Sequence, residues 1–359
     1  METYARELLP ELAARGDLQV TSFVNIVAAE RGGPWAQYGR QVVVPVDARR
    51  RIDWVRGEQQ HLPRLGRKAG VDLVHSLAST APLRGGPVRV TTIHDLLYLK
   101  VPEAHFGLRA LGMRVLVPAA ARRSHRLIVD AESTRRDLVE HLGVHPGKID
   151  AVPLAADPAL PVPPTSERQL REQLGLSARP VALSVSAKRP HKNLARLLRA
   201  LAAVCPDRRP TLVIPGYSTP HEQELWALAS QLGVRGDLRM PGWISAEDLE
   251  GLYGLASLVV LPSLYEGFGL PVLEAMRRGL PVACSDRSSL PEVAGDAALT
   301  FDPEDERAIT RAIERLLTDG DLIVRLRAAG PVQAARFSWR ATANATVASY
   351  HRALEGRVL

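Results

Sequence analysis

Short apolar runs alternate with helical periodicities along the whole chain. In the first half, runs rich in valine, isoleucine and leucine predict strands at 20–27, 41–46, 72–75, 88–94, 126–129 and 149–152. In the second half, similar runs predict strands at 181–185, 211–214, 237–239, 258–261, 280–284 and 298–301. Continuous apolar strands separated by amphipathic helices are typical of parallel sheets that helices cover on both faces. The pattern therefore predicts an α/β fold with doubly wound sheets.

A proline-rich segment separates the two series of strands. Residues 157–166 read Asp-Pro-Ala-Leu-Pro-Val-Pro-Pro-Thr-Ser, and the prolines exclude helix and sheet interiors. A chain of 359 residues suits two domains of about 150 residues each. We predict an N-terminal domain at 1–158, a C-terminal domain at 159–337 and a last helix at 338–359, capped by Ser338.

The composition indicates the class of protein and its expected location in the cell. The chain has 46% hydrophobic and 24% charged residues, as soluble globular proteins do. No apolar run reaches the ~20 residues of a membrane-spanning helix, and the start shows no signal-peptide pattern, so we expect a cytoplasmic protein. Cys205 and Cys284 are expected to be small core residues.

The positive charge is concentrated in the first half of the chain. Residues 1–155 hold 22 of the 46 basic and 16 of the 39 acidic residues, which is +6 of the net +7. This positive charge suits contact with an anionic membrane. A genome of high GC content, whose proteins are rich in arginine, explains the charge equally well. Nucleic acid is not expected, because no zinc-finger spacing, RNA-binding signature or long basic block is present.

The strongest chemical motif follows the predicted strand at 258–261. Pro271 suits the first turn of a helix, and the loop before it is glycine-rich. Four backbone N–H groups would point at an anion from the positive end of that helix: those of Gly267, Phe268, Gly269 and Leu270. Glu266 and Glu274 flank this loop, and carboxylates accept hydrogen bonds from the vicinal diols of sugars and riboses.

These residues resemble a known family. The pattern Glu266-x7-Glu274 within EGFGLPVLEA is similar to the retaining glycosyltransferases of family 4. The likeness extends through Pro241-Gly-Trp-Ile-Ser, Leu280-Pro-Val-Ala-Cys-Ser, Leu290-Pro-Glu-Val and Phe337-Ser-Trp. It implies the GT-B fold, in which two Rossmann-like domains face each other across a cleft and the last helix crosses back to the first domain. It also implies that Glu266 lies at the transferred sugar and that Glu274 holds the ribose; two surface or capping glutamates are the alternative.

A second motif, Ser-Val-Ser-Ala-Lys-Arg-Pro-His-Lys-Asn-Leu at 184–194, follows the predicted strand at 181–185. It resembles the family's stretch ending in Lys-Asn, which assigns contact with the donor diphosphate to Lys192. A fixed cation there would stabilise the leaving diphosphate without a metal. Ser186 and Ala187 replace the family's usual glycine and arginine, so Lys188 or Arg189 would substitute; a solvated lysine is the alternative.

Two further loops are expected to border the base of the nucleotide. One contains Gly216, and the other contains Trp243 and Ile244; for Trp243 a packing role is equally open. The triplet Asp319-Gly320-Asp321 is expected to join two helices rather than to bind a metal.

In the first half, the predicted strand at 88–94 ends in His94-Asp95. The resemblance implies that His94 lies near the transferred sugar and the acceptor, while Asp95 orients the loop or the imidazole. Ser133 is expected to cap the helix after the next strand.

Basic residues also suit docking of the first half on an anionic membrane. The stretch 105–123 mixes aliphatic residues with arginines, although ordinary core-facing helices look the same. More basic residues lie elsewhere in this half: Arg49, Arg50, Arg51, Arg64, Arg67 and Lys68.

The start of the chain resembles the family's first helix rather than its first strand. That strand is central in a doubly wound sheet, and the family's glycine-rich loop follows it. Without it, the strands at 20–27 and 72–75 would lack the partner between them. We therefore expect this chain to be a truncated form of a longer protein.

Together, the resemblance implies a hexosyltransferase of glycan biosynthesis that needs no cofactor or metal. It would transfer a sugar, with retention, from a nucleotide diphosphate to a saccharide or lipid-linked acceptor. The variants HDL and LYEGFGLP look most like those of mannosyl- and rhamnosyltransferases, so GDP-mannose is the first choice of donor. A UDP-sugar-dependent transferase and a non-catalytic nucleotide-sugar-binding protein are the alternatives. A dinucleotide-dependent oxidoreductase is disfavoured, because no strand is followed by Gly-x-Gly-x-x-Gly.

Overall fold

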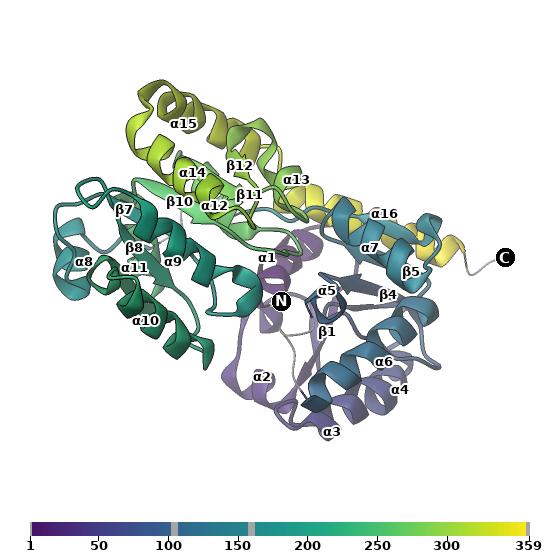
Figure 1. Ribbon diagram of the computed structural model, residues 1–359. Coiled ribbons are helices and arrows are strands. Elements are labelled where there is room, and N and C mark those ends of the chain that lie inside the picture. Colours follow the sequence, from purple (N-terminus) through teal and green to yellow (C-terminus); the bar gives the residue numbers. More distant parts are fainter. Residues whose placement is uncertain (1, 102–106, 157–161, 357–359) are drawn as a thin grey trace. The chain divides into compact units, whose positions relative to one another are not determined.

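The computed structural model describes residues 2–101, 107–156 and 162–356 (Figure 1). The chain divides into two compact units. The first unit contains Met1–Leu99, His105–Leu154 and Ser338–Leu359, and the second contains the rest. Each unit has its own parallel strands and its own helices.

The second unit is built on one sheet of six parallel strands in the order β12-β11-β10-β7-β8-β9. Its strands are β7 (Val181–Leu183), β8 (Thr211–Pro215), β9 (Leu238–Gly242), β10 (Leu258–Leu261), β11 (Val282–Ser285) and β12 (Leu299–Phe301). The chain adds β8 and β9 on one side of β7 and then returns to place β10 on the other side. The strand order therefore reverses between β7 and β10, and in such sheets ligands bind at the carboxyl ends of the strands where this reversal occurs.

Helices cover the strands of the second unit. They are α8 (Glu167–Leu174), α9 (Leu194–Ala203), α10 (His221–Gln231), α11 (Ala246–Leu255), α12 (Leu270–Arg277), α13 (Leu290–Ala294), α14 (Glu306–Thr318) and α15 (Gly320–Ala334). Leu197 of α9 and Ile313 of α14 are fully buried in one cluster with strand residues such as Val260. Helices α11 and α12 pack on β7, β10 and β11.

The first unit contains two separate parallel sheets. β1 (Thr21–Asn25) pairs with β2 (Arg40–Val44), and a second sheet has the order β3-β4-β5-β6. The strands of the second sheet are β3 (Leu73–Ser76), β4 (Val88–Ile93), β5 (Arg126–Val129) and β6 (Ile149–Ala151). Among the described residues no β-ladder joins β1 to β3, and the two strands were expected to lack the partner strand between them.

Eight α-helices are described in the first unit. They are α1 (Glu2–Ala13), α2 (Ile26–Arg31), α3 (Arg51–Arg56), α4 (Leu62–Ala69), α5 (Leu97–Lys100), α6 (Gly107–Arg123), α7 (Glu132–Leu142) and α16 (Trp339–Glu355). Helix α16 packs on α1, β4 and β5, and the Ser338 side chain caps it. No helix in the described ranges is both long and apolar enough to cross a membrane.

The structure confirms the predicted fold class, and each of the twelve predicted strands forms, with shifts of a few residues at the ends. Asp319 caps α15, so the acidic triplet is a helix junction as predicted. Two local predictions are wrong. Helix α7 begins after Ala131, so Ser133 lies inside it and does not cap it. Cys284 is buried, but Cys205 is exposed on the turn after α9 rather than in the core.

Candidate active site

A polar cluster of the second unit lies where its strand order reverses. The loop after β7 ends in a short 3₁₀ turn, Pro190–Lys192, and the loop after β10 carries Glu266. Because β7 and β10 are neighbours and parallel, both loops leave the same edge of the sheet. The sequence motifs around Lys192 and Glu266, 74 residues apart, therefore meet at this edge.

Lys192 and Glu266 form an ion pair. The Lys192 ammonium donates to Oε1 of Glu266 at 2.6 Å and to Oε2 at 2.8 Å, and Ser263 Oγ donates to Oε1 at 2.7 Å. The side chains of Lys192 and Glu266 are 19% and 11% exposed. Burial by itself would raise the pKa of the Glu266 carboxyl, but Lys192 and Ser263 outweigh burial and hold that pKa below its ordinary value.

Three residues that the sequence analysis did not single out hold these loops in place. Asn193 has a left-handed backbone (φ 57°), and its amide donates to the carbonyls of Pro262 and Pro303. Ser288, also left-handed (φ 58°), donates to the Glu266 carbonyl at 2.6 Å. Ser289 donates to the carbonyl of Phe268 at 2.8 Å. The ion pair therefore rests on loops tied to one another.

Glu274 lies in a different set of contacts. Its Oε2 accepts a hydrogen bond of 2.7 Å from the Tyr253 hydroxyl, and the Arg278 guanidinium lies 4.6 Å from the Tyr253 ring centroid. Burial raises the pKa of the Glu274 carboxyl, and Tyr253 and Arg278 offset this only in part. Among the interactions described, Glu266 and Glu274 share no partner. The sequence did not indicate Tyr253, which lies on α11.

The glycine-rich turn that is predicted to bind an anion lies directly before α12. The helix follows Gly269 and begins without a side-chain cap, with Pro271 at its second position. Gly269 has φ 102°, and a Cβ at this position would lie 2.5 Å from Leu290 Cδ2. Phe268 contributes differently, because its ring is buried against Phe337. The side chain of Phe268 therefore packs inside the second unit, and its backbone is the part that the proposed anion site would use.

Lys188 is fully buried, and its ammonium donates to the Gly216 carbonyl at 2.7 Å. Burial lowers the pKa of this ammonium. Gly216 has φ 131°, and a Cβ there would lie 2.3 Å from the Ser186 carbonyl oxygen. Its N–H donates to the Gly242 carbonyl at 2.7 Å. Lys188 thus joins the loops after β7 and β8, whereas Arg189 beside it is partly exposed.

The same loops display two exposed aromatic rings. Tyr217 follows Gly216 and is 61% exposed, and Trp243 follows β9 and is 70% exposed. Their ring centroids are 4.5 Å apart and the ring planes differ by 26°, so the rings stack. The structure thus places Trp243 at the surface rather than in the core, and Ile244 beside it is partly buried.

In the first unit, His94 follows β4 and contacts the ends of two other strands. Its Nδ1 lies 2.7 Å from Oδ2 of Asp130, which follows β5. Its Nε2 lies 2.9 Å from the carbonyl oxygen of Leu77, which follows β3. Asp95 accepts a hydrogen bond from the Leu97 N–H, so it orients the loop, as predicted, and Asp130 orients the imidazole.

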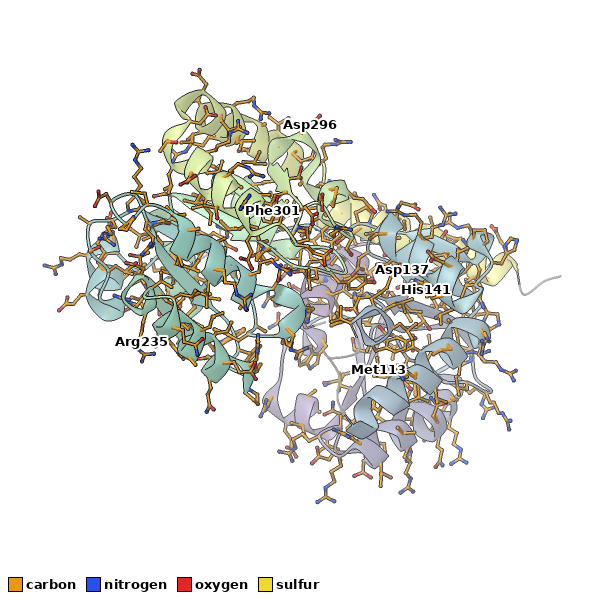
Figure 2. All side chains as sticks on the ribbon, in the orientation of Figure 1. Met113, Asp137, His141, Arg235, Asp296 and Phe301 are labelled. Atoms are coloured by element: carbon orange, nitrogen blue, oxygen red, sulfur yellow. The ribbon has the colours of Figure 1, made fainter. Side chains whose placement is uncertain are left out.

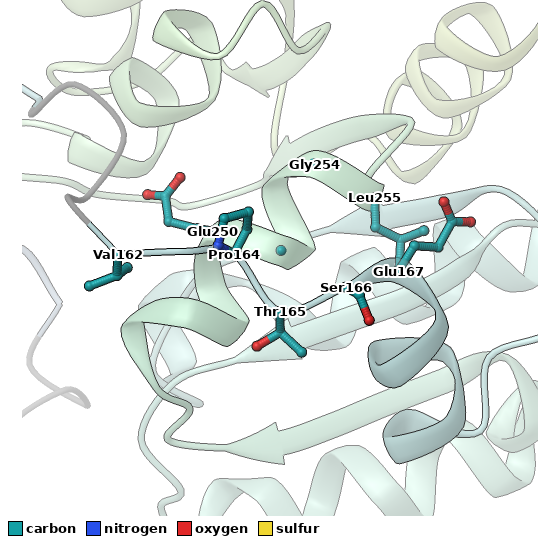
Figure 3. A pocket seen from close by; sticks show the side chains of 9 residues that line it. Val162, Pro164, Thr165, Ser166, Glu167, Glu250, Gly254 and Leu255 are labelled. Carbon is teal, nitrogen blue, oxygen red and sulfur yellow. The ribbon is translucent and has the colours of Figure 1, made fainter.

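A shallow pocket of about 320 Å³ opens elsewhere on the second unit (Figure 3). It is lined by Val162, Pro164, Thr165, Ser166, Glu167, Glu250, Gly251, Gly254 and Leu255. These residues come from the segment before α8, from its start and from α11. None of the predicted site residues lines this pocket, so the strand-end cluster remains the candidate active site.

The fold and this cluster define a class: a two-unit α/β protein with cationic and acidic side chains at the reversal point of its second sheet. Comparisons with known proteins identify the class. Residues 1–160 match the model described as "Glycosyltransferase Family 4", and residues 166–333 match "Glycosyl transferases group 1". The chain is 33% identical over 264 residues to O-antigen chain mannosyltransferase B of Escherichia coli, covering 73% of this chain and 69% of that protein.

Further similarities agree with this result. The serotype-specific mannosyltransferase WbdA of Escherichia coli is 30% identical to this chain over 275 residues. The match covers 74% of this chain and 34% of that longer protein. The structure of Anabaena Alr3699/HepE in complex with UDP and glucose has a TM-score of 0.75 at 19% identity, covering 98% of this chain and 95% of that one. The chain belongs to glycosyltransferase family 4, has the GT-B fold and is a hexosyltransferase.

Proposed function

We propose that this protein transfers a hexose from a nucleotide-diphosphate sugar to a saccharide or lipid-linked acceptor, with retention of the anomeric configuration. The observation that carries the proposal is the Lys192–Glu266 pair at the carboxyl ends of β7 and β10. A cation suits a diphosphate and a carboxylate suits sugar hydroxyls. Family membership supplies the reaction class, and no metal or other cofactor is part of the proposal.

Each group has a defined part in the proposed reaction. Lys192 and the amides at the start of α12 hold the diphosphate, Glu266 the sugar hydroxyls and Glu274 the ribose diol. The bond between the anomeric carbon and the diphosphate oxygen breaks, and its electron pair leaves with the diphosphate, where Lys192 stabilises the new charge. The acceptor oxygen then bonds to the anomeric carbon on the same face, and its proton passes to the leaving phosphate.

This reaction requires Lys192 to change partners. In the structure its ammonium is engaged by Glu266, so a bound diphosphate competes with Glu266 for the same cation. Loss of the lysine would leave Ser263 as the remaining hydrogen-bond donor against the effect of burial, and the pKa of Glu266 would rise. Donor binding is therefore expected to be accompanied by proton uptake in mildly acidic buffer.

Mannose from GDP-mannose is the first choice of donor. Two relatives are named as mannosyltransferases, and this supports mannose. A UDP-sugar is the second candidate, because a structural neighbour was solved with UDP and glucose. The proposed position of the base is beside Gly216, Trp243 and Ile244, where the stacked rings lie.

Tryptophan fluorescence, to which Trp243 and four other tryptophans contribute, provides a binding assay together with thermal shift. Titration of GDP and UDP, followed by tryptophan fluorescence and thermal shift, should show saturable binding with GDP preferred. Stabilisation by UDP but not by GDP would overturn the choice of GDP-mannose. NMR of the product formed from GDP-α-mannose should show an α-linkage; a β-linked product would contradict retention. Binding without transfer to any lipid-linked or saccharide acceptor would favour the non-catalytic alternative.

Peripheral membrane contact is proposed for the first unit. The six basic residues singled out in the sequence are all exposed: Arg49, Arg50, Arg51, Arg64, Arg67 and Lys68. Ile52, next to three of them, is 83% exposed. Basic groups beside an apolar side chain suit the surface of an anionic bilayer. Co-sedimentation with phosphatidylglycerol vesicles should occur and should weaken in the triple variant Arg49→Glu/Arg50→Glu/Arg51→Glu; equal binding to neutral vesicles would contradict it.

A further inference from the structure

His94 is held at both ring nitrogens by oxygen atoms. Nε2 lies 2.9 Å from the Leu77 carbonyl oxygen, and Nδ1 lies 2.7 Å from Oδ2 of Asp130. The Tyr4 ring packs against the imidazole in a T-shaped arrangement, with a centroid distance of 5.2 Å and an interplanar angle of 87°. The orientation of the imidazole is therefore fixed from three sides.

The partners of His94 determine how many protons it shares. A carbonyl oxygen can only accept, so Nε2 must carry a hydrogen. The bond to Asp130 needs a second hydrogen, which lies either on Nδ1 or on the carboxyl group. In both arrangements the pair holds one proton more than a neutral imidazole beside a carboxylate.

The charge of Asp130 favours the arrangement in which the imidazole is charged, whereas burial opposes it by lowering the pKa of His94 and raising that of Asp130. Asp130 is 2% exposed, and its Oδ1 has no hydrogen-bond partner in the part of the chain that is described. A carboxylate buried in this way needs a neighbouring cation. Burial lowers the pKa of His94, but Asp130 outweighs this effect and keeps that pKa above the ordinary value.

Among the described residues, three further titratable groups interact with the pair: the Asp95 carboxyl, the Tyr4 phenol and the His75 imidazole. Burial lowers the pKa of His75 to about 3, so this neighbour stays neutral. It is held by Tyr350 Oη at 2.8 Å and by Thr92 Oγ1 at 2.7 Å. Among the described residues, Asp130 is the carboxylate whose charge acts on His94, and Asp95 acts on Asp130.

We propose that Asp130 is a positioning residue that keeps both ring nitrogens of His94 protonated, so that His94 serves transfer as a fixed cation and not as a general base. The inference rests on the proposed function for its catalytic consequence. Its structural consequence is separate: His94 ties the ends of β3 and β5 to the end of β4. An imidazole with both N–H groups engaged has no lone pair to take the acceptor proton, which agrees with proton transfer to the leaving phosphate.

The test compares Asp130→Asn with a matched variant, Asp137→Asn. The asparagine oxygen can still accept from Nδ1, but it carries no charge. Asp137 lies on α7 with His141, 3.8 Å away (Figure 2), and forms no part of the site. Histidines labelled with ¹⁵N are titrated by NMR in the full chain, with His75 as the neutral reference, and transfer is measured against pH.

We expect both nitrogens of His94 to be protonated in the wild type at neutral pH. In Asp130→Asn the pKa of His94 should fall by about one to three pH units, and the alkaline limb of the rate profile should move down with it. Asp137→Asn should change neither. A neutral His94 in the wild type, or an unmoved alkaline limb in a folded Asp130→Asn variant, would overturn the proposal. If no donor supports transfer, the proposed function fails, but the NMR titration still decides the state of His94.

Discussion

Replacing Lys192 by methionine probes the ion pair of the second unit. Methionine keeps much of the side-chain length and removes the ammonium. Glu266, which is 11% exposed, would then keep the Ser263 hydroxyl as its remaining hydrogen-bond donor among the side-chain contacts described. The variant therefore leaves a carboxylate largely buried without a cation, which is costly in free energy.

The size of the effect follows from this burial. Removal of one partner from a buried ion pair destabilises proteins by about 3–5 kcal/mol. Because both side chains retain some exposure, we expect about 2–3 kcal/mol at neutral pH. For a unit of this size, each kcal/mol lowers Tm by about 2–4 °C, so Tm should fall by about 5–10 °C.

The effect should depend on pH in a defined direction. The pKa of Glu266 is lowered in the folded protein, so the pair stabilises the fold above the ordinary carboxyl pKa, and this contribution is lost as the pH falls through the folded value. In the variant, burial raises the same pKa, so Glu266 takes up a proton on acidification and the penalty shrinks. The Tm difference should therefore be larger at about pH 7.5 than at about pH 5.

Thermal unfolding of four proteins tests this argument. They are the wild type, Lys192→Met, Glu266→Gln and the double variant, with Lys68→Met as a control for loss of an exposed lysine. The double variant should recover most of the lost stability, because no buried charge is left unpaired. The reasoning fails if Lys192→Met melts with the wild type at both pH values, or if the double variant is less stable than Lys192→Met.

Two further predictions concern the helix start after β10. Glu274→Gln should raise the donor KM about tenfold with little change in kcat, since one charge-assisted hydrogen bond to the ribose is lost, whereas Glu266→Gln should lower kcat; equal, near-normal kinetics would contradict these roles. Gly269→Ala should destabilise the second unit by about 1–3 kcal/mol in urea unfolding, because of its φ of 102° and the clash with Leu290. Gly254→Ala, with open space around it, should be neutral or stabilising; equal stability of the two variants would count against the clash.

Some residues of the candidate site could be predicted from the sequence, and others could not. Glu266 and Lys192 were predicted, since their residue types and their positions after strands carry chemical meaning. Asn193 and Ser288 were not predicted, because their roles depend on a left-handed backbone and on carbonyls far along the chain. For Asn193 a signal existed, since asparagine tolerates that conformation more readily than most residues. For Ser288 there was none.

The sequence by itself determined the strands, the fold class and the family, because apolar periodicity and motifs are local properties of the chain. It also placed Glu266 and Lys192 at strand ends. Tertiary structure decided their partners: Lys192 with Glu266, Lys188 with Gly216, Glu274 with Tyr253 and His94 with Asp130. These pairs join residues 21–74 positions apart. Parallel pairing within each sheet aligns the strand ends and brings three of the pairs into contact, whereas Glu274 and Tyr253 meet between helices α12 and α11.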